Sequence, residues 1–131
     1  TLIVNGGNFK TVDCENKHGS IYYALYVAGE NGNVHCIING GTFKTEGNKA
    51  AVQMGNDNAG GDGGINAPAT GEIYGGTFVA PAGVTALKIE DKTAVAYIFG
   101  GSYTKAFDAK YLMPGYEFVE ENGYFVVREV A

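Results

Sequence analysis

The sequence is short of the residues that define several protein classes, with no Trp, 3 Pro and 2 Cys among its 131 residues. Collagen and Pro-rich disordered chains need far more Pro, so both classes are excluded. Two thiols do not make a disulfide scaffold. This leaves Cys14 and Cys36 either bridged to each other or present as a loop thiol and a small core residue. No apolar run approaches the roughly 18 residues of a membrane helix, so we expect no membrane insertion.

Positive charge is also sparse, with 9 Lys and Arg against 14 Asp and Glu and a net charge of −5. Proteins that bind nucleic acids need a concentrated basic surface. The basic residues here are scattered, so no nucleic-acid partner is expected. By contrast, apolar residues make up 45% of the chain. That is enough for a packed core, and the length fits one folded domain over residues 1–131.

Glycine is abundant, with 21 residues, and its pairs mark an internal repeat. Four segments align without gaps, and each carries an aliphatic residue, a Gly pair, a small polar residue and an aromatic ring. The unequal spacing between them comes from insertions at fixed points, which is typical of surface loops on stacked repeats. The four segments are Leu2–Phe9, Cys36–Phe43, Gly71–Phe78 and Ala96–Tyr103.

The apolar residues of each repeat alternate with period two, which is the pattern of a β-strand. One repeat cannot bury its apolar face alone, whereas stacked repeats bury a continuous one. Equivalent residues should then form ladders along parallel strands, with the Gly pair at a sharp bend between two ladders. We predict an aliphatic ladder of Val4, Ile38, Ile73 and Ile98, and an aromatic ladder of Phe9, Phe43, Phe78 and Tyr103.

Both ends of the chain depart from the repeat. Asn122-Gly123 lies between two alternating runs, which predicts a type I′ β-hairpin that covers the edge of the last repeat. Thr1 leads directly into a strand, so we expect another segment or a partner to cover that edge. The density of Gly disfavours helices. A β-sandwich remains the rival fold, although it does not need the same motif in four registers.

The Ile-x-Gly-Gly-Thr-Phe motif resembles the pectate-lyase-like β-helix repeats of bacterial surface proteins and of some phage fibre proteins. The closing segment from Gly100 to Tyr124 resembles the terminal motif of such arrays. The resemblance implies an all-β, right-handed parallel β-helix on an extracellular cell surface or virion surface, and it transfers no catalytic residue. The expected division is about four coils over 2–35, 36–70, 71–95 and 96–113, followed by a hairpin cap over 114–130.

Catalysis is not expected from the distribution of charged residues. Enzymes that cleave polysaccharides need a base with neighbouring cations, or two carboxylates that face each other. Here the Asp and Glu residues do not recur at equivalent positions of the repeat, and Arg128 is the single arginine. We therefore predict that the chain is not an enzyme. The alternative is the terminal piece of a longer polysaccharide lyase or depolymerase.

The segment 55–64 is the sharpest polar cluster in the sequence, and its Asp57 and Asp62 are candidate calcium ligands. Calcium takes six to eight oxygen ligands, which neighbouring Asn side chains would supplement. The motif occurs once, so a Gly-rich surface loop with no metal is the competing interpretation. No other cofactor is expected.

Six aromatic residues are expected to lie on outward faces or corners, where a solvated strand rarely places them. They fit a glycan-binding platform, a subunit interface, or packing beneath inserted loops. We expect a non-catalytic structural or adhesive module of a surface adhesin, stalk or phage fibre, which forms homo-oligomers or joins neighbouring segments of a longer chain. A carbohydrate-binding module is the alternative. The residues are Tyr22, Tyr23, Tyr26, Tyr74, Tyr97 and Phe99.

Overall fold

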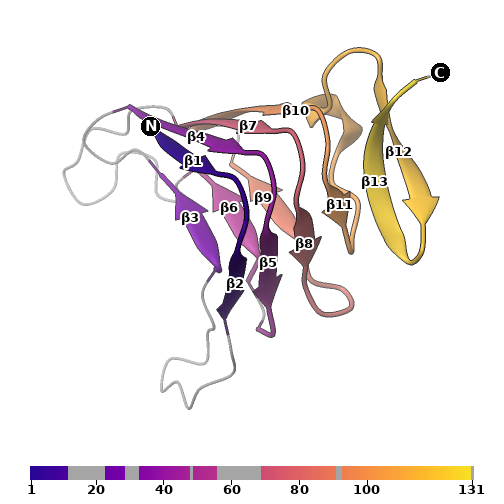
Figure 1. The fold of residues 1–131 in the computed structure, drawn as a ribbon, viewed down its shortest axis with the longest axis horizontal. Coiled ribbons are helices and arrows are strands. Elements are labelled where there is room, and N and C mark those ends of the chain that lie inside the picture. Colours follow the sequence, from indigo (N-terminus) through magenta and orange to yellow (C-terminus); the bar gives the residue numbers. More distant parts are fainter. Residues whose placement is uncertain (12–22, 29–32, 48, 56–68, 91–92, 131) are drawn as a thin grey trace.

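A computed structural model of the chain describes residues 1–11, 23–28, 33–47, 49–55, 69–90 and 93–130. Within these ranges nearly all regular structure is β, which confirms the expected all-β class. Strands from successive repeats lie side by side in three sheets, and the two termini lie at opposite ends of the stack (Figure 1).

The first sheet is fully parallel and holds the aliphatic ladder. Val4 pairs with Ile38, Ile38 with Ile73, and Ile73 with Ile98, so the predicted ladder is confirmed. The three isoleucines are fully buried, since period two turns alternate residues of each strand towards the core. The strand order is β1 (Leu2–Val4), β4 (Val34–Ile38), β7 (Ala69–Ile73) and β10 (Ala94–Ile98).

The second sheet holds the aromatic ladder. The ring centroids of Phe9 and Phe43 lie 5.0 Å apart, those of Phe43 and Phe78 5.2 Å, and those of Phe78 and Tyr103 4.7 Å. These spacings follow from in-register parallel pairing, which sets equivalent residues one strand spacing apart. The aromatic ladder is therefore confirmed. Its strands are β2 (Asn8–Thr11), β5 (Thr42–Thr45), β8 (Thr77–Val79) and β11 (Ser102–Tyr103).

The third sheet has three strands, because the last repeat adds none to it among the described residues. After β11 the chain instead forms a short 3-10 helix, η2 (Ala109–Tyr111), so the last repeat contributes strands to the first and second sheets alone. Leu87 pairs with Val52 in register, and both are buried. The strands of this sheet are β3 (Leu25–Val27), β6 (Val52–Met54) and β9 (Leu87–Ile89).

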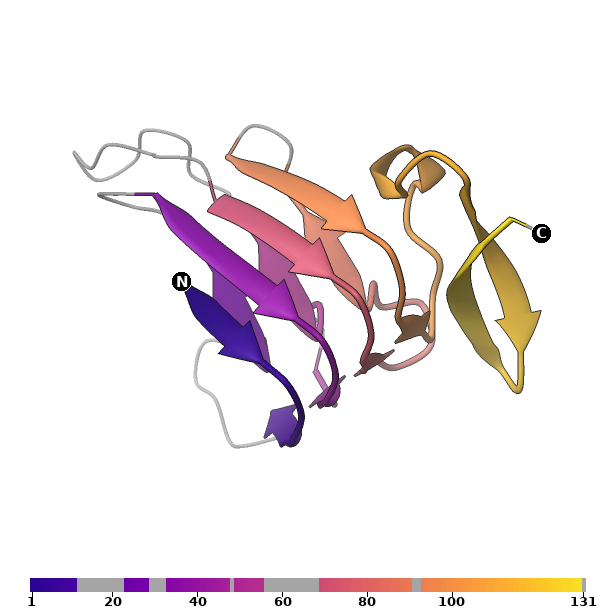
Figure 2. The same ribbon diagram turned by 45° about the horizontal axis from the view of Figure 1, so that its top comes forward.

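The chain ends in the predicted hairpin, formed by β12 (Tyr116–Glu121) and β13 (Tyr124–Glu129). Asn122 and Gly123 both have positive φ, at 53° and 83°, as a type I′ turn requires. Strand β13 pairs antiparallel with β11, so the hairpin extends the second sheet beyond the last repeat. Figure 2 shows the hairpin at the end of the stack, on the side away from β1.

The inward faces of the three sheets share one hydrophobic core, in which Ile38, Phe43 and Met54 have no exposed surface. Cys36 is a free thiol that is also fully buried, as expected of a small core residue. Burial raises the pKa of this thiol, so it stays protonated at neutral pH. Cys14 lies outside the described residues.

The Gly pairs allow the repeats to approach closely at the bend between the first and second sheets. A Cβ atom at Gly75 would lie 2.6 Å from the backbone oxygen of Asn39 in the preceding repeat. Its neighbour Gly76 has φ +108°, which side chains rarely tolerate. At the equivalent Gly6 of the first repeat, a Cβ meets no atom within 4 Å.

The substitution Gly75→Ala should therefore destabilise the protein by about 2 kcal/mol, as expected for an overpacked backbone contact. Gly6→Ala occupies the same motif position without that contact and should change the free energy of unfolding by less than about 0.5 kcal/mol. Urea denaturation followed by circular dichroism measures both values. Equal losses in the two variants would contradict close packing between the repeats.

Candidate functional site

The outer face of the first sheet carries a polar cluster that crosses two strands. His35 on β4 donates from Nε2 to Glu72 Oε2 on β7 at 2.5 Å. Tyr74, which follows β7 directly, donates its hydroxyl to Glu72 Oε1 at 2.6 Å. Each oxygen of one carboxylate thus accepts a hydrogen bond. His35 and Glu72 are diagonal neighbours across the sheet, because His35 pairs directly with Thr70.

These bonds change how the cluster titrates. The hydrogen bond from Tyr74 lowers the pKa of Glu72, and the hydrogen bond from His35 lowers it further. The pKa of Tyr74 is raised in turn by its bond to the carboxylate. At neutral pH, Glu72 is therefore ionised and Tyr74 keeps its proton. The ionised carboxylate of Glu72 holds the side chains of His35 and Tyr74 in place through these hydrogen bonds. Because it carries no proton at neutral pH, it cannot act as a general acid.

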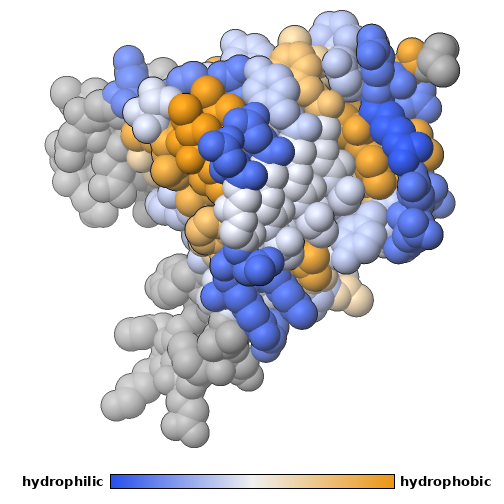
Figure 3. All heavy atoms as spheres, in the orientation of Figure 1, coloured by the Kyte–Doolittle hydropathy of each residue, from blue (hydrophilic) through white to orange (hydrophobic). Residues whose placement is uncertain are grey.

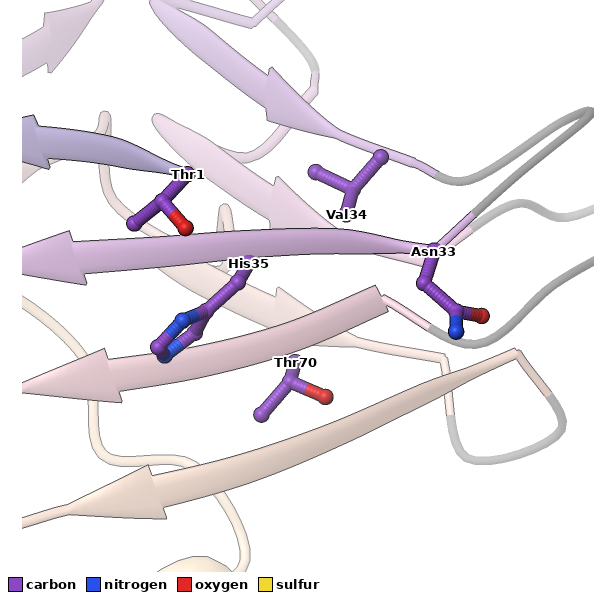
Figure 4. A pocket seen from close by; sticks show the side chains of 5 residues that line it. All are labelled: Thr1, Asn33, Val34, His35 and Thr70. Carbon is purple, nitrogen blue, oxygen red and sulfur yellow. The ribbon is translucent and has the colours of Figure 1, made fainter.

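A shallow pocket of about 350 Å³ opens beside this cluster. Figure 4 shows that the side chains of His35 and Thr70 point to the same side from neighbouring strands, whereas Val34 points to the other side. The lining offers an imidazole, hydroxyl groups and an amide, which suit hydrogen bonding to a polar ligand. The pocket is lined by Thr1, Asn33, Val34, His35 and Thr70.

Aromatic side chains continue the same face beyond the strand ends. The rings of Tyr74 and Phe99 stack in parallel with centroids 4.9 Å apart, and Phe99 also meets Tyr116 of the hairpin edge-on. Tyr74 is 47% exposed, and Tyr97 on β10 is exposed as well. In the first two repeats the Tyr74 position holds Asn5 and Asn39, which are joined by a side-chain hydrogen bond of 2.9 Å.

The remaining predicted aromatic residues lie elsewhere. Tyr23 and Tyr26 stack with centroids 5.2 Å apart at strand β3 of the third sheet. The predicted aromatic residues therefore form two separate groups rather than one platform, because β3 and β10 belong to different sheets. Tyr22 lies outside the described residues.

A second pocket, of about 340 Å³, lies over the third sheet beside Tyr23. Gln53 on β6 faces outward by strand alternation, yet its side chain is fully buried and its Nε2 donates to the backbone oxygen of Gly55 at 3.1 Å. Period two alone did not predict this burial. The pocket is lined by Tyr23, Lys49, Ala50, Gln53, Gly83, Val84, Thr85 and Lys88.

The two ends of the stack differ. Within the described chain, β1, β2 and β3 each have a strand partner on one side only. Leu2 and Phe9 occupy inward ladder positions but are 47% and 39% exposed, whereas Phe43 in the next repeat is fully buried. Ile3 is exposed beside Leu2, and Figure 3 shows hydrophobic surface over β1.

The predicted calcium ligands Asp57 and Asp62 lie outside the described residues. Among the described residues, no group of three or more His, Cys, Asp and Glu side chains is placed to hold a metal ion. No helix in the described ranges is long and apolar enough to cross a membrane.

Comparisons of the chain with protein-family models, with curated proteins and with solved structures found no match. The geometry of the chain itself is therefore what bears on its function.

Removal of the Tyr74 hydroxyl should raise the pKa of Glu72, because the largest cause of its lowering is lost. The pKa of Glu72 in the folded state lies below its ordinary value of 4.5. Ionised Glu72 therefore stabilises the fold at pH values above 4.5, and this stabilisation is lost as the pH falls through the lowered folded-state pKa. Tyr74→Phe should reduce this contribution. Carboxyl NMR titration of Glu72 measures the shift, with Tyr97→Phe on the same face as the control. An unchanged pKa of Glu72 in Tyr74→Phe would contradict the hydrogen bond.

Proposed function

We propose that the chain is a right-handed parallel β-helical module with a non-catalytic, structural or adhesive role on an extracellular cell or virion surface. Support for the fold comes from the parallel in-register pairing of the repeat strands in three sheets, to each of which the first three repeats contribute one strand each. The motif of the repeat supports the extracellular setting through its resemblance to surface-protein arrays.

The observation that carries this proposal is the difference between the two ends of the stack. At the C-terminal end, β13 pairs with β11, and Leu112 bridges to Ile98. Phe107 and Phe118 pack against the core there. Among the described residues, β1, β2 and β3 at the other end each have an unpaired strand edge. The hairpin covers one end of the stack, and the exposed edges at the other end could pair with more β-structure.

Within the open edge, strand β1 lacks the features that keep edge strands from pairing, whereas β2 carries Lys10. Strand β1 contains no charged residue and no Pro, which are the residues that commonly block an edge. Burial of apolar surface contributes roughly 25 cal/mol per Å². Pairing of further β-structure with this edge would therefore be stabilised both by burial of Leu2 and Phe9 and by new backbone hydrogen bonds. The occupant is a second copy of the chain or a neighbouring segment of a longer one.

Light scattering on a sizing column, at several concentrations, tests self-association through this edge. The wild-type chain should form a dimer or larger assembly, and Leu2→Lys should shift it to monomer by placing a charge at the open edge. Val130→Lys replaces another exposed apolar residue, beyond β13, and should leave the mass unchanged. A monomeric wild-type chain at every concentration would contradict self-association.

A carbohydrate-binding role is the second candidate, favoured by the exposed ring of Tyr74 beside the Glu72 carboxylate and His35. A ring face and hydrogen-bonding groups at one place match the mixed apolar and polar surface of a sugar. In this case Tyr74→Ala and Tyr97→Ala should each weaken glycan binding by roughly tenfold, the loss expected when an anchoring aromatic residue is removed. Glycan-array screening followed by calorimetry measures the effect. Unchanged affinity in both variants would rule out this face as the platform.

A further inference from the structure

The second sheet has an open edge at each end of the stack (Figure 1). Its strand order runs from β12 through β13, β11, β8 and β5 to β2, so within the described residues β12 and β2 each pair on one side only. Strand β13 is antiparallel to β11, and β12 is antiparallel to β13. After these two reversals, β12 runs in the same direction as β11, and therefore as β2. Two copies stacked head to tail would bring these edges together in parallel, the orientation in which the repeat strands already pair.

The backbone of β2 presents hydrogen-bonding groups at its outer edge. The carbonyl oxygens of Gly7 and Thr11 both accept hydrogen bonds from the second repeat, so odd-numbered residues of the first repeat point their backbone groups towards β5. Alternate residues of a strand bond to opposite sides. The backbone groups of Asn8 and Lys10 therefore point to the open edge, where a further strand would pair without any change in β2.

The side chains on the two edges carry opposite charges. Strand β12 has Glu117, Glu120 and Glu121 and no basic residue, whereas β2 has Lys10 and no acidic residue. Pairing of β12 with a second β12, or of β2 with a second β2, would set like charges side by side, which is unfavourable across strands. Pairing of β12 with β2 sets opposite charges side by side. Charge therefore favours the head-to-tail contact over both edge-to-edge alternatives.

One register of this contact suits both faces of the sheet. Phe118 packs against the core at one end of the stack, and Phe9 is the partly exposed first ring of the aromatic ladder at the other end. Alignment of Phe118 with Phe9 of the next copy would cover that exposed ring. Because side chains alternate along a strand, the same register places Lys10 on the outer face, diagonally between Glu117 and Glu121. The inward and outward sides of the contact therefore specify the same alignment.

The existing partner of Lys10 leaves this contact open. Lys10 forms an ion pair with Glu46 at 2.9 Å, and the two side chains are 49% and 39% exposed. Exposed ion pairs contribute little to stability, because water screens both charges. An ammonium group also has three donors. Lys10 can therefore keep its bond to Glu46 and add a carboxylate of the neighbouring copy.

We propose that copies of the chain join head to tail through the second sheet, with β12 of one copy paired in parallel with β2 of the next. Head-to-tail pairing rests on the self-association proposed above, and it names the surface of the second copy that the open edge receives. Such a contact joins two different surfaces, so each assembly still has a free β2 and a free β12 at its ends. Growth therefore continues past the dimer, and the second sheet runs on from copy to copy.

Charge reversal tests the contact, with the mass measured by light scattering on a sizing column at low salt, where charges are screened least. The mass of the wild-type chain should rise with concentration beyond that of a dimer. Lys10→Glu and Glu117→Lys should each weaken association by roughly tenfold, because each sets like charges across the contact. A double variant that carries both substitutions restores opposite charges and should assemble like the wild type.

Lys105→Glu makes the same change of charge on an exposed lysine outside both edge strands and should leave the mass unchanged. Circular dichroism checks that each variant keeps the all-β fold. Single variants that assemble like the wild type, a double variant as weak as the single ones, or a mass that stops at the dimer would each overturn head-to-tail pairing while self-association through the first repeat stands. A wild-type chain that stays monomeric would overturn both proposals.

Discussion

In-register parallel pairing between repeats is the constraint on which the structure depends. The pairing places each residue one strand spacing from the equivalent residue of the next repeat. Side chains at a given repeat position must therefore pack well against side chains of the same type. Phe43 meets this condition by stacking on both Phe9 and Phe78, and Ile38 meets it between Val4 and Ile73. A shift of one residue would turn the buried set of side chains outward, so the core and the backbone bonds specify the same register.

The same constraint explains where polar side chains gather. Outward positions are free of the core but are still stacked, so a change of residue between repeats creates a mixed cluster. His35, Thr70 and Val95 form one such row, and Tyr26, Gln53 and Lys88 form another. The second row combines a ring, an amide and a cation, which the core ladders never do. On this chain, side chains of different chemistry come together where the repeat is broken on the outer faces of the sheets.

The ladders and the hairpin were predictable from sequence, because a repeated motif fixes the register and Asn122-Gly123 fixes the turn. The contact between His35 and Glu72 was not predicted, because it is diagonal and depends on side-chain direction rather than on alignment. The burial of Gln53 was missed for another reason. Alternation assigns it to the outer face correctly, but turns before β6 and β9 shape the pocket above it, and their conformation has no periodic signal.

The position of the termini at opposite ends of the stack has a mechanical consequence. A pull applied between residue 1 and the hairpin acts along the direction in which the strands are stacked, parallel to the hydrogen bonds between them. Force in this direction breaks the interstrand hydrogen bonds of one repeat at a time instead of shearing the bonds of all repeats together. The hairpin is joined to the stack through β11 by only two residue pairs, fewer than any strand of the first repeat, so the bonds between β11 and β13 are the weakest step along this direction. A module of this kind would lengthen stepwise under tension and absorb work before it failed.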